Sequence, residues 1–405
     1  MLKRTLSILY LLSRLAISWV RHILGLSKAK HIRLGEEIEP QIGELRSILL
    51  FGYMGMGDAV MFEPALRAFL HRFPKAQFDL VVGRGSQSLA ILKHIMWEHG
   101  REFRSIIMAD FKAMSRRELK SLNSTLADNS YEACIAVYTT PIQYYVSAIE
   151  SIPIRIGHAI RAQAWYKPRP NYLFNIARTV DQNIDEREPY RHYRLAQAVG
   201  IQSQGELPVP RITISDQNQA WARDFLQREG LHNKELIAVH LGVSKAMNWK
   251  KWSDERYAAV FERLRKPNRH FLFFGGVDER EEIEIARAHI IEVSSVFAGS
   301  LDVIQVGALL TQCKMTIGND SGIGHLSIAI GTPTFRIFGP SDHYGCEPYS
   351  EEHVTLYKDL SCSPCMNLGL IKAGYNVLNC GHRNCLGYIS VDEVTDSISN
   401  LLTRK

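Results

Sequence analysis

The chain has 405 residues, more than one compact core usually holds, which predicts two domains. Hydrophobic residues make up 46% and charged residues 22%, a globular balance that argues against a disordered chain. The formal net charge of +6 comes from scattered Lys and Arg without a dense basic run, so nucleic acid is not an expected partner. This charge suits an anionic ligand or an anionic membrane surface.

Residues 1–45 form an extension before the first predicted strand. Its stretch from Thr5 to Leu26 is apolar but is interrupted by Arg14 and Arg21. A spanning helix needs about twenty apolar residues with few charges, and a secretory signal ends at a small-residue cleavage site, so the stretch matches neither. It is predicted either as a helix lying in the plane of a membrane or as a helix packed on this chain or a partner.

Residues 46–205 are predicted to form a first doubly wound α/β domain. Buried strands are expected at SILLFGY, FDLVVG, RSIIMAD and EACIAVY, separated by helical segments such as Glu63 to His71. The passage from about Arg161 to Arg191 is rich in Arg, Pro, Tyr and Asn and predicts a long loop. Long loops in compact enzymes are often functional, which makes this passage a candidate binding surface.

A glycine-rich turn, GYMGMGDAV, follows the first strand. Its glycines Gly52, Gly55 and Gly57 run in the reverse order of a dinucleotide fingerprint, and no acidic residue ends the next strand, which disfavours a nicotinamide enzyme. Glycines at a strand end let a ligand approach the backbone closely. Asp58 opens the following helix and is predicted either as its N-cap or as a general base at the mouth of a cleft.

Residues 206–232 are predicted to form a linker region, and residues 233–360 a second doubly wound domain. Its strands are expected at LIAVHLG, FLFFGG, KMTIGND and TFRIFGP. Its helices are expected at approximately Asp254 to Arg265, Glu279 to His289, Val303 to Gln312 and Gly324 to Ile330. Such sheets bind ligands at the carboxyl ends of their strands, so a cleft between the two domains is the expected site.

Two polar segments follow strand ends in this second domain. Ser244, Lys245 and Lys250 place hydroxyl and ammonium donors after LIAVH, where they either meet a diphosphate or face solvent. Asp278 and Glu279 come after FLFFGG and either cap the next helix or bind a ribose or a base.

The segment NDSGIGH joins the strand KMTIGND to an apolar helix. The amides of Ser321, Gly322 and Ile323 at this helix start predict an anion site, because free N–H groups and the helix dipole both favour phosphate. A carboxylate beside an anion site is costly unless it binds hydroxyls, so Asp320 is predicted to hold a sugar. His325, one turn along, is either a phosphate donor or a satisfied core histidine.

Residues 361–405 are predicted to form a Cys-rich loop and a C-terminal helix. Four thiols, Cys362, Cys365, Cys380 and Cys385, have a spacing that suits a structural zinc or iron ion. Free thiols are the alternative, since Cys also occurs as a buried apolar residue.

Together and in this order the motifs resemble glycosyltransferase family nine, the ADP-heptose-using lipopolysaccharide heptosyltransferases. The resemblance covers about residues 47–394 and rests on GDAV with a Pro-Ala-Leu helix, K-x-W, GG with a following acid, NDSGIGH and GTPTFRIFGPSD. It implies the GT-B fold, two facing Rossmann-like domains, with inversion at the anomeric carbon and no catalytic metal. By resemblance, Asp58 is the base, Lys250 and His325 meet the diphosphate, and Asp320 holds sugar hydroxyls across the cleft from Asp58.

The resemblance also sets the expected partners. The donor is expected to be ADP-heptose and the acceptor the lipid A–Kdo inner core, at the cytoplasmic face of the inner membrane. Alternatives are a transferase that glycosylates a protein or uses another nucleotide sugar, and a non-catalytic sugar-binding subunit. Two features depart from the family: the long N-terminal extension, and a K-x-W element far from its strand, which makes Lys245 a competing phosphate ligand. Some members carry a similar cysteine cluster, and those that modify autotransporters use it for iron.

Overall fold

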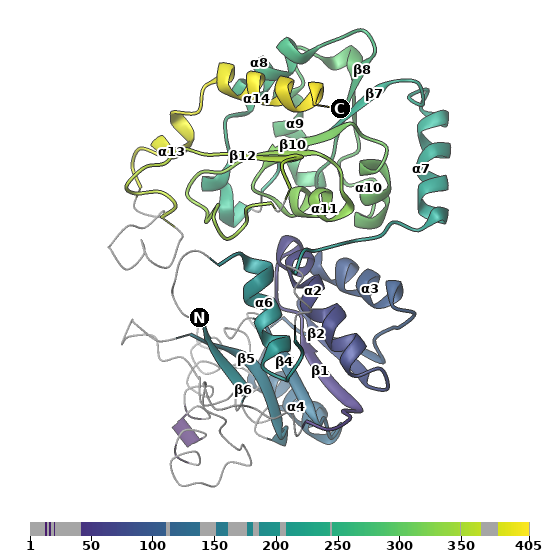
Figure 1. Ribbon diagram of the computed structural model, residues 1–405, viewed down its shortest axis with the longest axis vertical. Coiled ribbons are helices and arrows are strands. Elements are labelled where there is room, and N and C mark those ends of the chain that lie inside the picture. The colour runs from purple at the N-terminus through teal and green to yellow at the C-terminus, as the bar shows by residue number, and fades with distance from the viewer. Residues whose placement is uncertain are drawn as a thin grey trace. The chain divides into compact units, whose positions relative to one another are not determined.

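The computed structural model describes residues 42–110, 114–137, 151–160, 176–180, 186–202, 208–243, 245–348, 350–365 and 380–404, with Ser13, Ala16, Ile17 and Val20. The chain divides into two compact units (Figure 1), Met1–Asp181 with Pro189–Pro210 and Gln182–Glu188 with Arg211–Lys405. Most of the apolar N-terminal stretch lies outside the described residues. Within the described ranges, no helix is long and apolar enough to cross a membrane.

The first unit contains a parallel six-stranded sheet in the order β3-β2-β1-β4-β5-β6. Its strands are β1 (Ser47–Phe51), β2 (Gln77–Val82), β3 (Ser105–Met108), β4 (Ala133–Ala136), β5 (Ile154–Ile160) and β6 (Ile176–Val180). Its helices are α2 (Met56–Arg72), α3 (Ser88–Glu98), α4 (Arg116–Asp128) and α6 (Glu188–Gln197). Leu119 and Leu126 of α4 pack with Leu49 and Phe51 of β1. The other face of the sheet is covered by α2 and α3 (Figure 1).

The second unit repeats this design in a parallel sheet of order β12-β11-β10-β7-β8-β9. Its strands are β7 (Glu235–His240), β8 (Arg269–Phe273), β9 (Ser294–Val296), β10 (Met315–Asn319), β11 (Thr334–Ile337) and β12 (His353–Leu356). Its α-helices are α7 (Asp216–Arg228), α8 (Asp254–Leu264), α9 (Arg280–Ala286), α10 (Val303–Leu310), α11 (Gly322–Ile330), α13 (Asn384–Gly387) and α14 (Val391–Thr403). Its 3-10 helices are η3 (Lys245–Lys250), η4 (Val277–Glu279) and η5 (Ile291–Val293).

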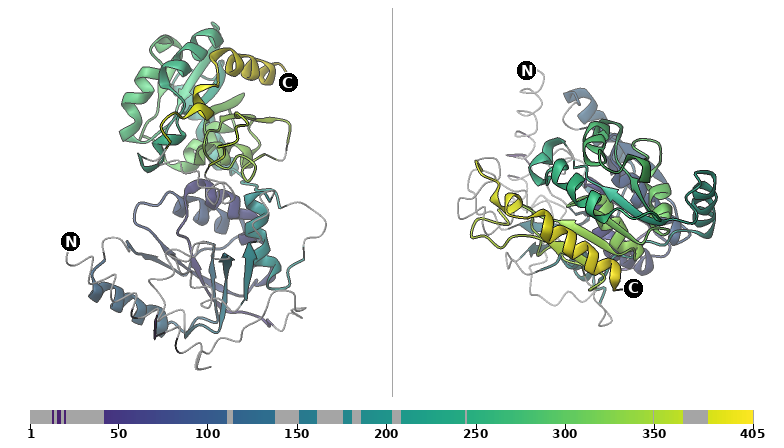
Figure 2. Two further views of the ribbon diagram at one scale, coloured as in Figure 1. Left: turned by 90° about the vertical axis from the view of Figure 1, so that its left-hand side faces the viewer. Right: turned by 90° about the horizontal axis from the view of Figure 1, so that it is seen from above.

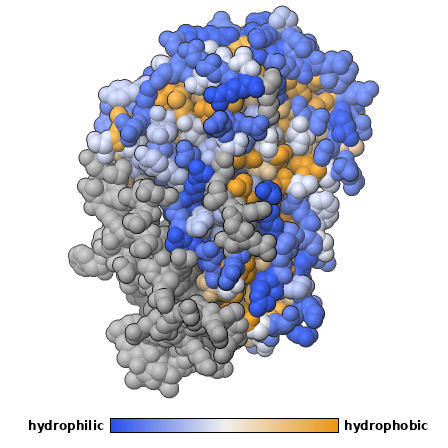
Figure 3. All heavy atoms as spheres, viewed as in Figure 1, coloured by the Kyte–Doolittle hydropathy of each residue, from blue (hydrophilic) through white to orange (hydrophobic). Residues whose placement is uncertain are grey.

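Helices cover both faces of the second sheet. On one face α8 packs with α9 and α14, and on the other α10 packs with α7 and α11. Figure 2 shows α14, in yellow, lying along this unit. Most of the visible surface of the unit is hydrophilic, with apolar areas interspersed (Figure 3), as expected when each helix buries one stripe of its side chains.

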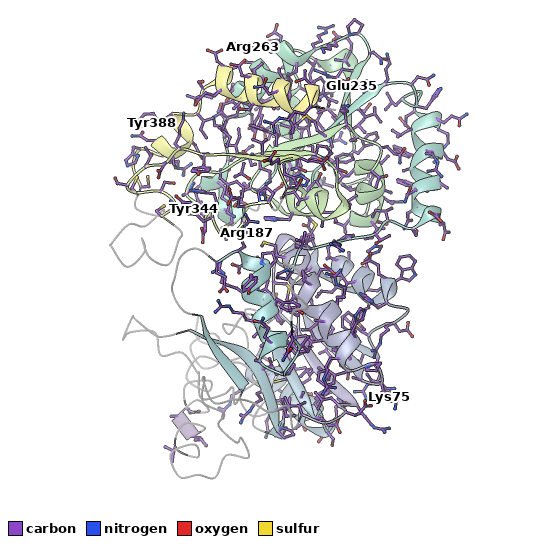
Figure 4. All side chains as sticks on the ribbon, in the orientation of Figure 1. Lys75, Arg187, Glu235, Arg263, Tyr344 and Tyr388 are labelled. Carbon is purple, nitrogen blue, oxygen red and sulfur yellow. The ribbon has the colours of Figure 1, made fainter. Side chains whose placement is uncertain are left out.

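The segment before α6 belongs to the second unit because it binds the loop that follows β11. The amide of Glu188 donates to the carbonyl oxygen of Gly345 at 2.7 Å. The Arg187 guanidinium lies 3.6 Å from a carboxylate oxygen of Glu347. Figure 4 labels Arg187 and Tyr344 on these neighbouring segments. The chain therefore enters the second unit briefly before α6 returns it to the first.

All eight strands expected from apolar runs are confirmed as β1 to β4, β7, β8, β10 and β11. The four strands that were missed, β5, β6, β9 and β12, lie at or next to sheet edges, where polar residues interrupt the apolar run. The long loop predicted from Arg161 to Arg191 is wrong at β6 and at the start of α6. The predicted linker range 206–232 contains α7.

Both sheets share the strand order 3-2-1-4-5-6 of doubly wound folds when each is numbered from its own first strand. In this order the chain reverses its direction of progression between the first and fourth strands. Doubly wound sheets bind their ligands at this point, at the carboxyl ends of the strands. The expected ligand positions therefore follow β1 and β4 in the first unit and β7 and β10 in the second.

Candidate functional site

The turn after β1 positions Asp58 at the start of α2. Gly55 is the N-cap of this helix, and the Asp58 carboxylate accepts a hydrogen bond from the Gly55 amide at 2.9 Å. The N-cap prediction for Asp58 is therefore wrong. Asp58 is the third helical residue, and its side chain accepts from the amide of the N-cap residue, as the acid of a capping box does. Its half-buried carboxylate is held at the helix start, beside the exposed Gly55.

Asp320 and the start of α11 lie where β7 and β10 end, the expected ligand position of the second unit. Asp320 directly follows β10, and Ser321 is the N-cap of α11, its side-chain oxygen 3.5 Å from the amide of Gly324. The predicted helix start is confirmed, so the amides of Gly322 and Ile323 lie at the positive end of the helix dipole. This end is suited to bind an anion.

Asp320 is 7% exposed and lies close to the side chains of Lys250 and His325. Lys250 Nζ lies 2.6 Å from one carboxylate oxygen, and His325 Nε2 lies 3.8 Å from the other. Burial works against ionisation of Asp320, but the hydrogen bond with His325 and the charge of Lys250 hold its pKa well below the usual range. Sequence positions 250, 320 and 325 are thus brought together around one ionised carboxylate.

The structure distinguishes Lys250 from its neighbours. Lys251 Nζ is paired with Asp254 at 2.7 Å and with Glu282 at 3.5 Å, away from Asp320. Lys245 begins η3, but its side chain and all of Ser244 lie outside the described part of the structure.

Asn319, the last residue of β10, fixes this arrangement and was missed from the sequence. Its side chain accepts from the backbone amide of Trp252 at 3.1 Å and donates to the carbonyl of Leu241 at 2.8 Å. The buried asparagine thereby ties the segment after η3 and the end of β7 to the end of β10, and Trp252 is a packing residue of the core. The Asn of the NDSG run was the available signal.

Glu279 lies over the carboxyl ends of β7 and β8. Its carboxylate accepts from the Gly276 amide at 2.7 Å, which confirms a capping role, whereas Asp278 beside it is exposed. Burial raises the pKa of Glu279. A Cβ on Gly242 would lie 1.9 Å from a Glu279 oxygen, so glycine at 242 makes room for this carboxylate.

His240 is a second residue that the sequence did not single out. It ends β7, its Nδ1 lies 3.1 Å from Ser321 Oγ, and its Nε2 lies 3.9 Å from Glu279. Burial lowers the pKa of His240 to about 4, so the ring is neutral near pH 7. The His240 ring therefore lies between Glu279 and Ser321, the N-cap residue of α11.

The four late cysteines are free thiols in one region of the second unit. Burial, and then the neighbouring thiols of Cys385, Cys380 and Cys362, raise the pKa of Cys365 to about 11. Cys365 packs against Trp249, the residue before Lys250. No group of three or more His, Cys, Asp or Glu side chains close enough to hold a metal occurs among the described residues.

Two doubly wound units, each a parallel sheet covered by helices, give the chain the GT-B fold. Residues 120–375 match glycosyltransferase family 9 (heptosyltransferase), and the chain belongs to this family. It is therefore a transferase enzyme. Asp58 precedes the matched residues.

Individual relatives agree with this assignment. The chain is 25% identical over 367 residues to lipooligosaccharide heptosyltransferase 2 of Haemophilus ducreyi, which covers 88% of this chain and 99% of that protein. The structure of Escherichia coli ADP-heptose lps heptosyltransferase II has a TM-score of 0.66 at 21% identity, covering 88% and 99% of the two chains. The Escherichia coli heptosyltransferase WaaC with ADP-2-deoxy-2-fluoro heptose has a TM-score of 0.59 at 16% identity, covering 87% and 99%. The two solved structures share the fold.

Proposed function

We propose that this enzyme transfers a heptose from ADP-heptose to the lipid A–Kdo inner core of lipopolysaccharide, with inversion and without a catalytic metal. The observation that carries the proposal is the cluster of Lys250, Asp320 and His325 at the start of α11. It offers positive charge for a diphosphate beside a carboxylate for sugar hydroxyls. The names of the relatives supply the heptose and the ADP donor.

On the donor side, Lys250 and the amides at the start of α11 stabilise the negative charge that develops on the leaving diphosphate. These groups supply the positive charge that a divalent ion supplies in other transferases. Asp320 accepts hydrogen bonds from the sugar hydroxyls, and Glu279 from the ribose. Lys250 pairs with Asp320, which holds its ammonium between this carboxylate and the proposed diphosphate.

On the acceptor side, Asp58 takes the proton from the attacking hydroxyl. The acceptor oxygen approaches the anomeric carbon from the face opposite the leaving diphosphate, while positive charge grows on the sugar ring. The helix start holds the carboxylate through its bond with Gly55. Attack from the opposite face inverts the anomeric configuration.

The lipid-linked acceptor also suggests where the enzyme works. We infer that it acts at the inner face of the cytoplasmic membrane, with the apolar N-terminal stretch contacting the membrane surface or a partner. The net charge of +6 favours an anionic surface. Nucleic acid has no part in this function.

Cys362, Cys365, Cys380 and Cys385 are proposed to hold a structural zinc or iron ion. Four thiolates are a donor set that both metals accept. Burial first, and then the neighbouring Cys380 and Cys362, raise the pKa of both Cys365 and Cys385. Elemental analysis of the purified protein is expected to find about one metal per chain. Loss of that metal in Cys365→Ser supports the site, and a metal-free wild type contradicts it.

Two alternatives use the same site. The acceptor is a protein rather than a saccharide, or the donor carries another nucleotide. A non-catalytic sugar-binding subunit would need neither a positioned Asp58 nor the paired Lys250 and Asp320, so catalysis is the better account.

Thermal shift with a panel of nucleotides tests the proposed donor. ADP and ADP-heptose are expected to raise the melting temperature, because ligands that bind only the folded state stabilise it in proportion to their affinity. UDP, GDP and their sugars are expected to give smaller shifts. A larger shift with a uridine or guanosine compound than with the adenosine compounds would overturn the ADP-heptose assignment.

A further inference from the structure

Arg336 of β11 lies buried next to the start of α11. It is 1% exposed, although it carries a full positive charge. A Cβ on Gly324 would lie 2.8 Å from Arg336 Cδ, so the first turn of α11 rests on the arginine stem. The guanidinium carbon lies 5.0 Å from the centre of the Phe338 ring. The guanidinium therefore lies inside the second unit, beneath the proposed diphosphate site.

The hydrogen bonds of Arg336 fix its direction. One Nη donates to the carbonyl of Cys346 at 2.8 Å and to Thr355 Oγ1 at 3.1 Å, and the other lies 3.5 Å from His325 Nδ1. The Nε atom is buried and has no hydrogen-bond partner among the residues that the structure describes. Among the described residues no carboxylate lies within salt-bridge distance of Arg336, which is unusual for a buried charge.

This geometry determines the tautomer of His325. An arginine only donates hydrogen bonds, so His325 Nδ1 accepts and the ring proton lies on Nε2, facing Asp320. Arg336 therefore orients the imidazole from behind.

Asp320 is the carboxylate that acts on Arg336, and it is paired with Lys250 at 2.6 Å. Glu188 and Asp342 are the other acidic groups near Cys346, whose carbonyl accepts a hydrogen bond from Arg336. Among the described residues none of these carboxylates forms a direct ion pair with the guanidinium. A buried cation without a direct counter-ion is stabilised by an anionic ligand nearby.

We propose that Arg336 is a positioning residue for the donor diphosphate: through His325 it orients the Nε2 proton, and its buried charge favours a ligand with two phosphates over one. This inference rests on the proposed function and adds the residue that makes the site select a diphosphate.

Titration calorimetry with ADP and AMP on two variants of the full chain tests the proposal. Arg336→Gln keeps an amide donor for His325 but removes the charge. It is expected to raise the Kd of ADP about tenfold and that of AMP less than about threefold, since the second phosphate loses the larger electrostatic attraction. Arg336→Lys keeps the charge and is expected to retain the preference for ADP. Equal weakening of ADP and AMP by Arg336→Gln would reduce Arg336 to a structural residue and overturn the proposal.

The pH dependence of the Kd of ADP separates the effect of Arg336 on the tautomer of His325 from the effect of its charge. Asp320 and Arg336 lie next to His325, Lys250 pairs with the same Asp320, and Arg336 acts on the thiol of Cys346. In Arg336→Met no donor occupies Nδ1, so His325 takes up a proton as pH falls and binds phosphate more strongly. The ratio of its ADP Kd to that of the wild type is therefore expected to shrink from pH 8 to pH 6. A constant ratio in Arg336→Met would contradict the tautomer role.

Thr355→Val tests the proposal if the Arg336 variants do not fold. It removes one hydrogen-bond acceptor of the guanidinium, on β12. It is expected to raise the Kd of ADP more than that of AMP, by a smaller factor than Arg336→Gln does, and unchanged binding of both nucleotides would count against the proposal. Wild-type binding tests the donor separately. A wild type that binds UDP rather than ADP would overturn the proposed function, and the same comparison with UDP and UMP would still decide the role of Arg336.

Discussion

Asp58→Asn is expected to lower the rate of transfer by about 10²- to 10⁴-fold, the usual contribution of a positioned general base. An amide oxygen still accepts the hydrogen bond from Gly55, so the start of α2 is retained. The amide cannot take a proton from the acceptor hydroxyl. The measurement is the initial rate of acceptor-dependent ADP release at saturating donor.

The binding controls for Asp58→Asn are equally specific. The Kd of ADP is expected to remain within about twofold of the wild-type value, because the proposed donor residues all belong to the second unit. Asp128→Asn, at an exposed position in the same unit, is the matched control and is expected to transfer normally. A transfer rate for Asp58→Asn within about threefold of the wild type would remove Asp58 as the base.

Lys250→Met is expected to lower kcat by about 10²- to 10³-fold, the usual effect of removing one group that stabilises developing charge. The methionine keeps the length of the side chain but leaves the diphosphate without its ammonium. Lys251→Met is the matched control, since Lys251 pairs with Asp254 and Glu282 instead. Lys251→Met is expected to change stability more than transfer.

The melting temperature of Lys250→Met as a function of pH tests the interaction between Lys250 and Asp320. The pKa of Asp320 is lowered in the folded state, so its interactions stabilise the protein above the ordinary carboxyl pKa of about 4. This contribution is lost as pH falls through the folded value. The variant is therefore expected to melt furthest below the wild type at neutral pH, with a gap that narrows only below about pH 4. A larger loss of transfer in Lys245→Met than in Lys250→Met would assign the diphosphate to Lys245.

The central strands could be predicted because each is a continuous apolar run buried on both faces, as in LIAVH and FLFFGG. Edge strands such as β9 and β12 are short and partly exposed, so their sequences lack this signal. The start of α2 was misplaced because Gly55 has no capping side chain, and the carboxylate that closes the cap lies three residues later.

The site was predictable where it follows a strand end in a recognised motif, as Asp320 and Ser321 do. His240 and Arg336 carry no such signal. Each is a polar residue in a mostly buried strand. Its role depends on partners more than ten residues away: Glu279 and Ser321 for His240, His325 for Arg336. The arginine within TFRIF was the one visible hint, because a charge in a central buried strand requires a partner.

The most direct test of the central claim is the product formed by the wild-type enzyme from ADP-heptose and a lipid A–Kdo acceptor in the presence of a chelator of divalent ions. The anomeric configuration of the new linkage is read by NMR. The account predicts acceptor-dependent release of ADP at an undiminished rate and a configuration opposite to that of the donor. Retention of the donor configuration, or transfer that returns only when Mg²⁺ or Mn²⁺ is added, would contradict it.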